Sequence, residues 1–294
     1  PQEKRNIHSR NLRLSFSMSD TAPTSDLSAR VKTGFPLAAG IAILLFTPAF
    51  VVGLAVIVVA FIGAQELTTM LSAKDGKSDS TVVILPEWLL PGAAVLMGLG
   101  ALAGESGLYA ALLVCALGWI FFELVFTPKS ELAKLSSLGF GLFGMVWAVW
   151  SVLHITLIKT LPEGTALLFY LLLVISFSDI FAYFGGKKFG KSLLAPSISP
   201  KKTWEGSFFG VVGGGIVGAV FGELTMSMFW LYGLVLAMLL TVVGQLGDLV
   251  ESKIKRLCNV KDSGTLLPGH GGILDRIDGH MLAAPVFYYL LQLG

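Results

Sequence analysis

The sequence predicts an all-α polytopic membrane protein of about nine transmembrane helices, with its N-terminus cytoplasmic and its C-terminus outside. Of its 294 residues, 54% are apolar and only 14% are charged, whereas soluble domains average about 45–50% and about 25%. This composition excludes intrinsic disorder, which needs low hydrophobicity and high charge. Two cysteines exclude a disulfide-rich secreted scaffold.

The expected spans follow from the charge-free segments. No charged residue occurs from Thr33 to Gln65, and one helix of that length would rise about 50 Å, more than the ~30 Å hydrocarbon core. Because a residue before proline avoids helical geometry, we expect a turn at Thr47–Pro48 between two short spans. The nine expected spans are 34–47, 48–65, 88–104, 106–126, 135–158, 164–185, 206–222, 225–247 and 279–293.

The basic residues support this count. In the nine-span arrangement, 20 of the 21 lysines and arginines fall in cytoplasmic segments and only Lys159 falls outside, as the positive-inside rule requires. A single span over 33–65 would reverse the N-terminus and place the six basic residues of the tail on the wrong side. The cytoplasmic segments would be 1–33, 66–87, 127–134, 186–205 and 248–278.

The N-terminal segment differs from the rest of the chain. Residues 1–32 are polar, serine-rich and aperiodic, so we expect a disordered cytoplasmic tail before a single transmembrane domain, 33–294. The tail lacks the apolar run of a signal peptide. Met18 is a candidate start, which would make residues 1–17 an upstream extension; the sequence leaves this open.

One stripe of polar residues lies where the eighth span would continue into the cytoplasm. On a helix, Asp248, Ser252, Lys255 and Asn259 share one face. A carboxylate, a hydroxyl and an ammonium in line could hold a metal ion and a phosphate chain. The alternative is a basic collar at the membrane surface with an incidental aspartate, and the stripe alone favours that collar.

A glycine-rich segment follows the stripe. Glycines beside His270 allow close backbone approach and leave N–H groups for phosphate oxygens. Asp275 and Asp278 would share a helix face, and carboxylates with few imidazoles suit Mg²⁺ better than zinc. The alternative is a glycine-rich turn in which Asp275 caps a helix and Asp278 pairs with Arg276.

The run from Ser252 to Asp278 resembles the signature of the CDP-diacylglycerol synthases, also called phosphatidate cytidylyltransferases. It reads Ser-x-Ile-Lys-Arg-x4-Lys-Asp-x-Gly-x2-Leu-Pro-x-His-Gly-Gly-Ile-x-Asp-Arg-Ile-Asp, without departure at any defined position. The resemblance extends back to about Arg30. It implies that 33–294 is a catalytic domain, a nucleotidyltransferase that converts CTP and phosphatidic acid to CDP-diacylglycerol and pyrophosphate in phospholipid biosynthesis.

The segment 186–205 carries a second motif. Lys201 and Lys202 can meet phosphates or anionic headgroups, and Trp204 can anchor at the interface; with the resemblance, substrate binding is favoured over a plain basic loop. Asp179 lies inside an apolar span, where acids are costly and mark functional sites. The alternative for Asp179 is pairing with a nearby lysine.

These observations give a set of expected site residues. The lipid phosphate is itself a nucleophile, with a second pKa of about 6 as in phosphoserine, so no strong base is needed. Asp248 and Asp275 are expected to bind the cofactor, Mg²⁺, as one ion or more than one. The expected catalytic residues are Ser252, Lys255, Arg256, Lys261, Asp262, His270, Arg276 and Asp278. The expected substrate-binding residues are Asp179, Lys201, Lys202, Thr203, Glu205, Gly271 and Gly272.

The expected partners are CTP, phosphatidic acid and membrane lipids, with no nucleic acid; a homodimer is left open. The expected location is the bacterial inner membrane, with the active site on the cytoplasmic face. The same-class alternatives are a CTP-dependent lipid-alcohol kinase and an isoprenoid-lipid cytidylyltransferase. A secondary transporter is the alternative from another class, although transporters place their sites near the bilayer midplane.

Overall fold

The computed structural model describes residues 36, 38–72, 85–127, 130–266 and 271–293. The expected tail 1–32 and His270 lie outside this part of the chain. Within it the protein is helical apart from one two-stranded hairpin, which confirms the all-α class. Six helices are long and apolar enough to cross a membrane, so this is an integral membrane protein.

The helices follow the expected spans closely. A short helix, 38–45, ends before Thr47–Pro48, and Thr47 Oγ1 donates a 2.6 Å hydrogen bond to the carbonyl of Leu44 at this turn. The elements after the turn are α2 (Ala49–Ser72), α3 (Leu89–Leu102), α4 (Glu105–Phe126), α5 (Glu131–Gly144), the π-helix η1 (Met145–Trp150), α6 (Ser151–Thr160), α7 (Gly164–Phe189), β1 (Leu193–Ala195), β2 (Ser199–Thr203), α8 (Trp204–Met226), α9 (Trp230–Leu257) and α10 (Leu274–Leu293).

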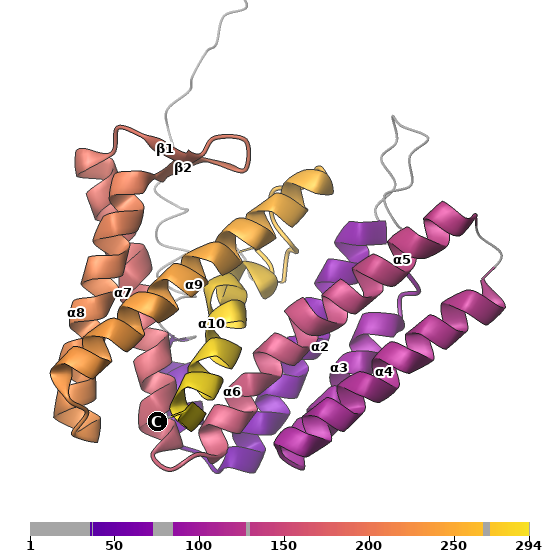
Figure 1. The fold of residues 1–294 in the computed structure, drawn as a ribbon, viewed down its shortest axis with the longest axis horizontal. Coiled ribbons are helices and arrows are strands. Elements are labelled where there is room, and N and C mark those ends of the chain that lie inside the picture. Colours follow the sequence, from indigo (N-terminus) through magenta and orange to yellow (C-terminus); the bar gives the residue numbers. More distant parts are fainter. Residues whose placement is uncertain (1–35, 37, 73–84, 128–129, 267–270, 294) are drawn as a thin grey trace, which may run out of the picture.

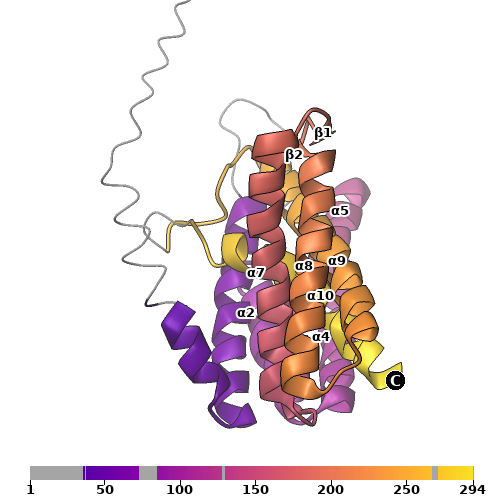
Figure 2. The same ribbon diagram turned by 90° about the vertical axis from the view of Figure 1, so that its left-hand side faces the viewer.

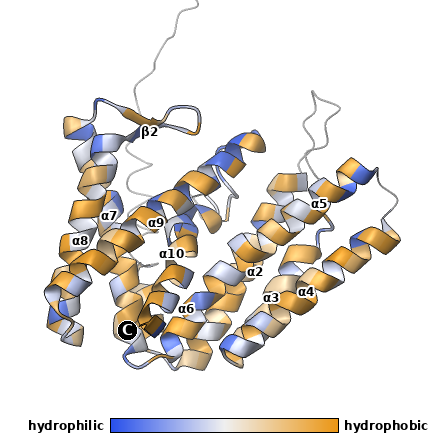
Figure 3. Cartoon of the chain, viewed as in Figure 1, coloured by the Kyte–Doolittle hydropathy of each residue, from blue (hydrophilic) through white to orange (hydrophobic). Residues whose placement is uncertain are grey.

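The helices form one bundle whose two ends differ. The hairpin, the C-terminal end of α9 and the start of α5 lie at one end, and the C-terminus of α10 lies at the other (Figures 1 and 2). Hydrophilic residues gather along the last turns of α9 and the start of α5, while most other helical surface is hydrophobic (Figure 3). Buried apolar residues of α2, α3, η1, α6, α7 and α10 make up most of the core.

Glycines bring α8 close to its neighbours. A Cβ atom at Gly214 would lie 3.2 Å from the carbonyl oxygen of Val174 on α7, and one at Gly218 would lie 3.2 Å from that of Gly233 on α9. Small residues of this kind let membrane helices approach at backbone distance. The start of α8, and the hairpin joined to it, are thereby held beside α7 and α9.

The hairpin is the one element that the sequence does not predict. The segment 186–205 is expected to be a polar loop, but it contains the end of α7 and both antiparallel strands. Thr203 Oγ1 accepts a 3.1 Å hydrogen bond from the N–H of Gly206 and caps α8. The side chain of Arg256 on α9 donates to the carbonyl of Ile198 in the hairpin turn, at 3.3 Å.

Candidate active site

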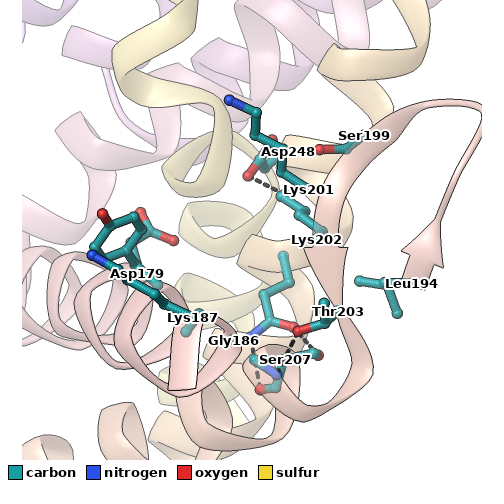
Figure 4. Close-up of a pocket in the computed structure, with 14 residues that line it drawn as sticks. Asp179, Gly186, Lys187, Leu194, Ser199, Lys201, Lys202, Thr203, Ser207 and Asp248 are labelled. Carbon is teal, nitrogen blue, oxygen red and sulfur yellow. Dashed lines mark hydrogen bonds and ion pairs between the residues drawn. The ribbon is translucent and has the colours of Figure 1, made fainter. Parts of the chain in front are cut away.

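A cavity of about 490 Å³ opens between α7, the hairpin, α8 and α9. Its lining includes four of the expected substrate-binding residues, namely Asp179, Lys201, Lys202 and Thr203. Asp179 approaches from α7, opposite the hairpin and Asp248 (Figure 4). The cavity therefore brings together the intramembrane aspartate and the two loop segments that the sequence singles out.

The hairpin and α9 meet through an ion pair. The ammonium of Lys202 contacts the carboxylate of Asp248, and each side chain is about 30% exposed (Figure 4). On the next turns of α8 and α9, Gln245 Nε2 donates a 3.2 Å hydrogen bond to the carbonyl of Ser207. These contacts join residues 46 and 38 positions apart in the chain.

Three carboxylates form an acidic cluster beside this ion pair: Asp248, Glu251 and Asp278. One oxygen of each lies within 4.8 Å of the others, and Glu251 is fully buried. Asp248 and Glu251 share a face of α9 because they are three residues apart, and α10 supplies Asp278. Sequence reasoning missed Glu251, although its spacing from Asp248 was the available signal.

Asp275 lies outside the acidic cluster, and its carboxylate makes contacts with other groups. It pairs with Lys255 at 2.6 Å, and Lys255 in turn pairs with Glu251 at 2.6 Å. Asp275 also accepts hydrogen bonds from the N–H groups of Gly272, at 2.8 Å, and Ser263, at 2.9 Å. Burial alone would raise the pKa of Asp275, but Lys255 and these N–H donors hold the pKa below its usual range.

The acidic cluster differs from the expected ligand pair of Asp248 and Asp275. Asp248 and Asp275 are not neighbours in a group that could hold a metal ion; among the described residues Asp278 and Glu251 accompany Asp248. The carboxylate of Asp275 instead holds the segment before α10, through the hydrogen bonds that it accepts from Gly272 and Ser263.

The other expected residues occupy three kinds of position. Ser252 Oγ donates to Asp248 at 3.3 Å, next to the acidic cluster. The side chains of Arg256 and Glu205 make hydrogen bonds to backbone groups. Arg256 donates to the hairpin turn, and Glu205 accepts hydrogen bonds from the N–H groups of Lys191 and Ser192 before β1. The remaining ones lie on the signature segment, with Lys261, Asp262 and Arg276 exposed, Gly271 at φ 79° and Gly272 buried.

A second cavity, of about 580 Å³, lies between η1, α9 and α10. Its lining is almost entirely apolar and aromatic, with Trp147 and Trp150 on η1 and Pro285 on α10. It begins at Leu282, one helical turn beyond Asp278 on the same face of α10. Phe143, Val146 and Leu293 of this lining are exposed, so the cavity is an open apolar groove that starts one helical turn from Asp278.

The membrane-spanning helices and the joined acidic and basic groups define a polytopic membrane protein with a polar site at one end. The chain belongs to the Cytidylyltransferase family, whose sequence model matches residues 28–294. This membership confirms the resemblance seen in the signature.

Individual relatives carry a more specific name. Phosphatidate cytidylyltransferase of Bacillus subtilis (strain 168) is 47% identical over 131 residues, 44% of this chain and 49% of that protein. The protein of that name in Brucella abortus biovar 1 (strain 9-941) is 42% identical over 159 residues, 52% and 57% of the two chains. The Synechocystis protein of that name is 36% identical over 267 residues, 81% and 87%. The match to the first two relatives therefore spans only about half of their length.

Proposed function

We propose that the protein transfers the cytidylyl group of CTP to phosphatidic acid, forming CDP-diacylglycerol and pyrophosphate. The observation that carries this proposal is the Lys202–Asp248 ion pair, which sets a basic hairpin against three clustered carboxylates at one cavity. Two anionic substrates repel one another, so their reaction needs cationic groups around both phosphates. Relatives named phosphatidate cytidylyltransferase support this substrate pair.

The acidic cluster fits Mg²⁺. It offers oxygen ligands only, and Glu251 Oε1 is buried without a hydrogen-bond partner within the described part of the chain. A buried carboxylate oxygen in that state is the kind of atom that a cation satisfies. We assign Asp248, Glu251 and Asp278 as ligands, for one ion or more than one. When bound, Mg²⁺ would neutralise charge on the phosphate oxygens.

The side chains of the first cavity would hold CTP. Lys201 and Lys202 from the hairpin and Lys187 from α7 would bind triphosphate oxygens, and Ser252 would support Asp248. A phosphate oxygen of the lipid attacks the α-phosphorus of CTP. The bond between that phosphorus and the oxygen bridging to the β-phosphate breaks, and pyrophosphate leaves with the bonding electrons. For Lys261, Arg276 and His270 we retain contacts to the triphosphate, and for Gly271 and Gly272 phosphate contacts through their N–H groups. Asp262 stays a proposed catalytic residue of the signature.

The second cavity would accept an acyl chain of the lipid. From Leu282 to Leu293 the lining of α10 extends roughly 16 Å at 1.5 Å per residue, about half of the ~30 Å hydrocarbon core. A lipid phosphate at the acidic cluster would leave its hydrocarbon beside this apolar lining. The lipid would enter sideways from the bilayer.

We further propose the nine-span arrangement, with residues 1–32 as a cytoplasmic tail and 33–294 as one catalytic domain. The hairpin and the last turns of α9, which carry basic residues, lie at one end of the bundle, and α6, whose last turn contains Lys159, ends at the other (Figure 1). This arrangement supports a cytoplasmic active site. Bacterial relatives support the inner membrane as the location. No dimer interface is proposed.

The proposal is tested with purified protein, phosphatidic acid and CTP labelled in its base, with and without Mg²⁺. We expect the label in the extracted lipid and pyrophosphate in the water phase, only when Mg²⁺ is present. A lipid-alcohol kinase would release labelled CDP instead, and a transporter would consume no nucleotide. Either result would overturn the proposal.

A further inference from the structure

Glu66, near the end of α2, contacts the signature segment, which lies about two hundred residues later in the sequence. Its carboxylate accepts hydrogen bonds from the N–H groups of Ile273 and Leu274, both at 2.9 Å, and from the hydroxyl of Ser263 at 3.0 Å. These partners are 197 to 208 residues away in sequence. A glutamate at the end of an apolar span would otherwise be taken only as a marker of the water boundary.

These contacts satisfy the beginning of α10. The first N–H groups of a helix have no partners within the helix, and a carboxylate there is favoured by the helix dipole. Glu66 thus caps α10 from another helix. Asp278 lies one turn after Leu274, so the placement of the first turn decides where Asp278 meets Asp248 and Glu251.

Two signature glycines leave room for this carboxylate. A Cβ atom at Gly264 would lie 2.7 Å from Glu66 Oε1, and the three heavy atoms nearest to it all belong to Glu66. A Cβ atom at Gly272 would lie 2.5 Å from Glu66 Oε2. The absence of side chains at Gly264 and Gly272 is therefore explained, in packing terms, by the presence of Glu66.

We propose that Glu66 is a positioning residue that fixes the start of α10 and thereby the geometry of the acidic cluster. A chain of contacts runs from Glu66 through Ser263 to Asp275, and from Asp275 through Lys255 to Glu251. Glu66 therefore acts on both the α10 and the α9 ligands without binding the ion. This inference rests on the metal assignment proposed above.

The test measures Mn²⁺ affinity from the electron paramagnetic resonance signal of the free ion, apart from turnover. Glu66→Gln keeps the side-chain length but replaces one accepting oxygen by a donor that faces N–H groups. We expect Mn²⁺ binding to weaken at least about tenfold, as for other residues that orient metal ligands. Glu87→Gln, at an exposed acid before α3, is the matched control and should leave the affinity unchanged. Wild-type affinity in Glu66→Gln would refute the inference.

A double-mutant cycle keeps the inference testable if Glu66→Gln folds poorly. Gly264→Ala alone retains every charged group, and we expect it to weaken Mn²⁺ binding by displacing Glu66. In a Glu66→Ala background the same change should add little, because the contacts that it disturbs are gone. Additive losses in the cycle would contradict the inference.

The outcomes separate this role from the proposed reaction. If the wild type forms no CDP-lipid while Glu66→Gln weakens Mn²⁺ binding, the reaction is refuted and the role of Glu66 stands. If the wild type forms CDP-lipid and Glu66→Gln binds Mn²⁺ normally, the role of Glu66 alone is refuted.

Discussion

Replacing Asp278 with asparagine should stabilise the metal-free protein while weakening its response to Mg²⁺. Within the acidic cluster, oxygens of three carboxylates lie within 4.8 Å of one another. At that distance and an effective dielectric constant of about 20, two of these carboxylates would repel by about 3.5 kcal/mol if both were ionised. Lys202 and Lys255 offset part of this repulsion, so we expect a net gain of about 1 kcal/mol or more in Asp278→Asn.

The metal-bound protein should respond in the opposite direction. Mg²⁺ at about 100 times its dissociation constant stabilises a folded protein by about 2.7 kcal/mol, and a tenfold loss of affinity removes about 1.4 kcal/mol of that. Asp275→Asn supplies the contrast: it loses the Lys255 ion pair and the hydrogen bonds from Gly272 and Ser263, so its metal-free form should be less stable.

The assay is thermal melting in detergent, followed by tryptophan fluorescence with and without Mg²⁺. Asp278→Asn should melt higher than the wild type without Mg²⁺ and gain less from the ion. Asp275→Asn should melt lower without Mg²⁺. If Asp275→Asn were instead the variant that gains stability and loses the Mg²⁺ response, the ligand assignment would be refuted and the pair expected from sequence restored.

Three further predictions concern the two cavities and the dependence of stability on pH. Lys202→Gln should raise the KM for CTP roughly tenfold, the size expected for one lost charge-assisted contact; steady-state kinetics at saturating lipid would show this. Because the folded pKa of Asp275 is depressed, its contribution to stability is present above the ordinary aspartate pKa and disappears as the pH falls through the folded value. Asp275→Asn should therefore show a weaker loss of melting temperature on acidification than the wild type. Leu282→Trp should lower turnover of long-chain phosphatidic acid and spare a short-chain analogue, in paired assays of the two lipids; equal losses would argue against the acyl-chain site.

Local signals in the sequence predict much of the fold. The Thr47–Pro48 turn, the extension of α9 to Leu257 and the close packing of α8 follow from proline geometry, a polar helical stripe and a run of glycines. The placement of Ser252 beside Asp248 follows from the same stripe. Each of these depends on residues within a few turns of one another.

The parts of the site that the sequence does not predict depend on how distant elements cross. Asp275 and Asp278 are both early in α10, and only the packing of α10 against α9 decides which of them meets Asp248 and Glu251. Similarly, nothing near Glu66 in the sequence indicates that it caps a helix about two hundred residues later. The pairing of Lys202 with Asp248 also requires the hairpin, which the polar segment does not signal.

The most direct test of the central claim follows the phosphorus atoms of CTP. Parallel reactions with phosphatidic acid and Mg²⁺ would contain CTP labelled at the α-phosphorus or at the γ-phosphorus, and both products would be separated by lipid extraction. We predict that the α-label enters the lipid and that the γ-label leaves as pyrophosphate, in equal amounts. Transfer of the γ-label to lipid, or no label in lipid from either nucleotide, would contradict the account.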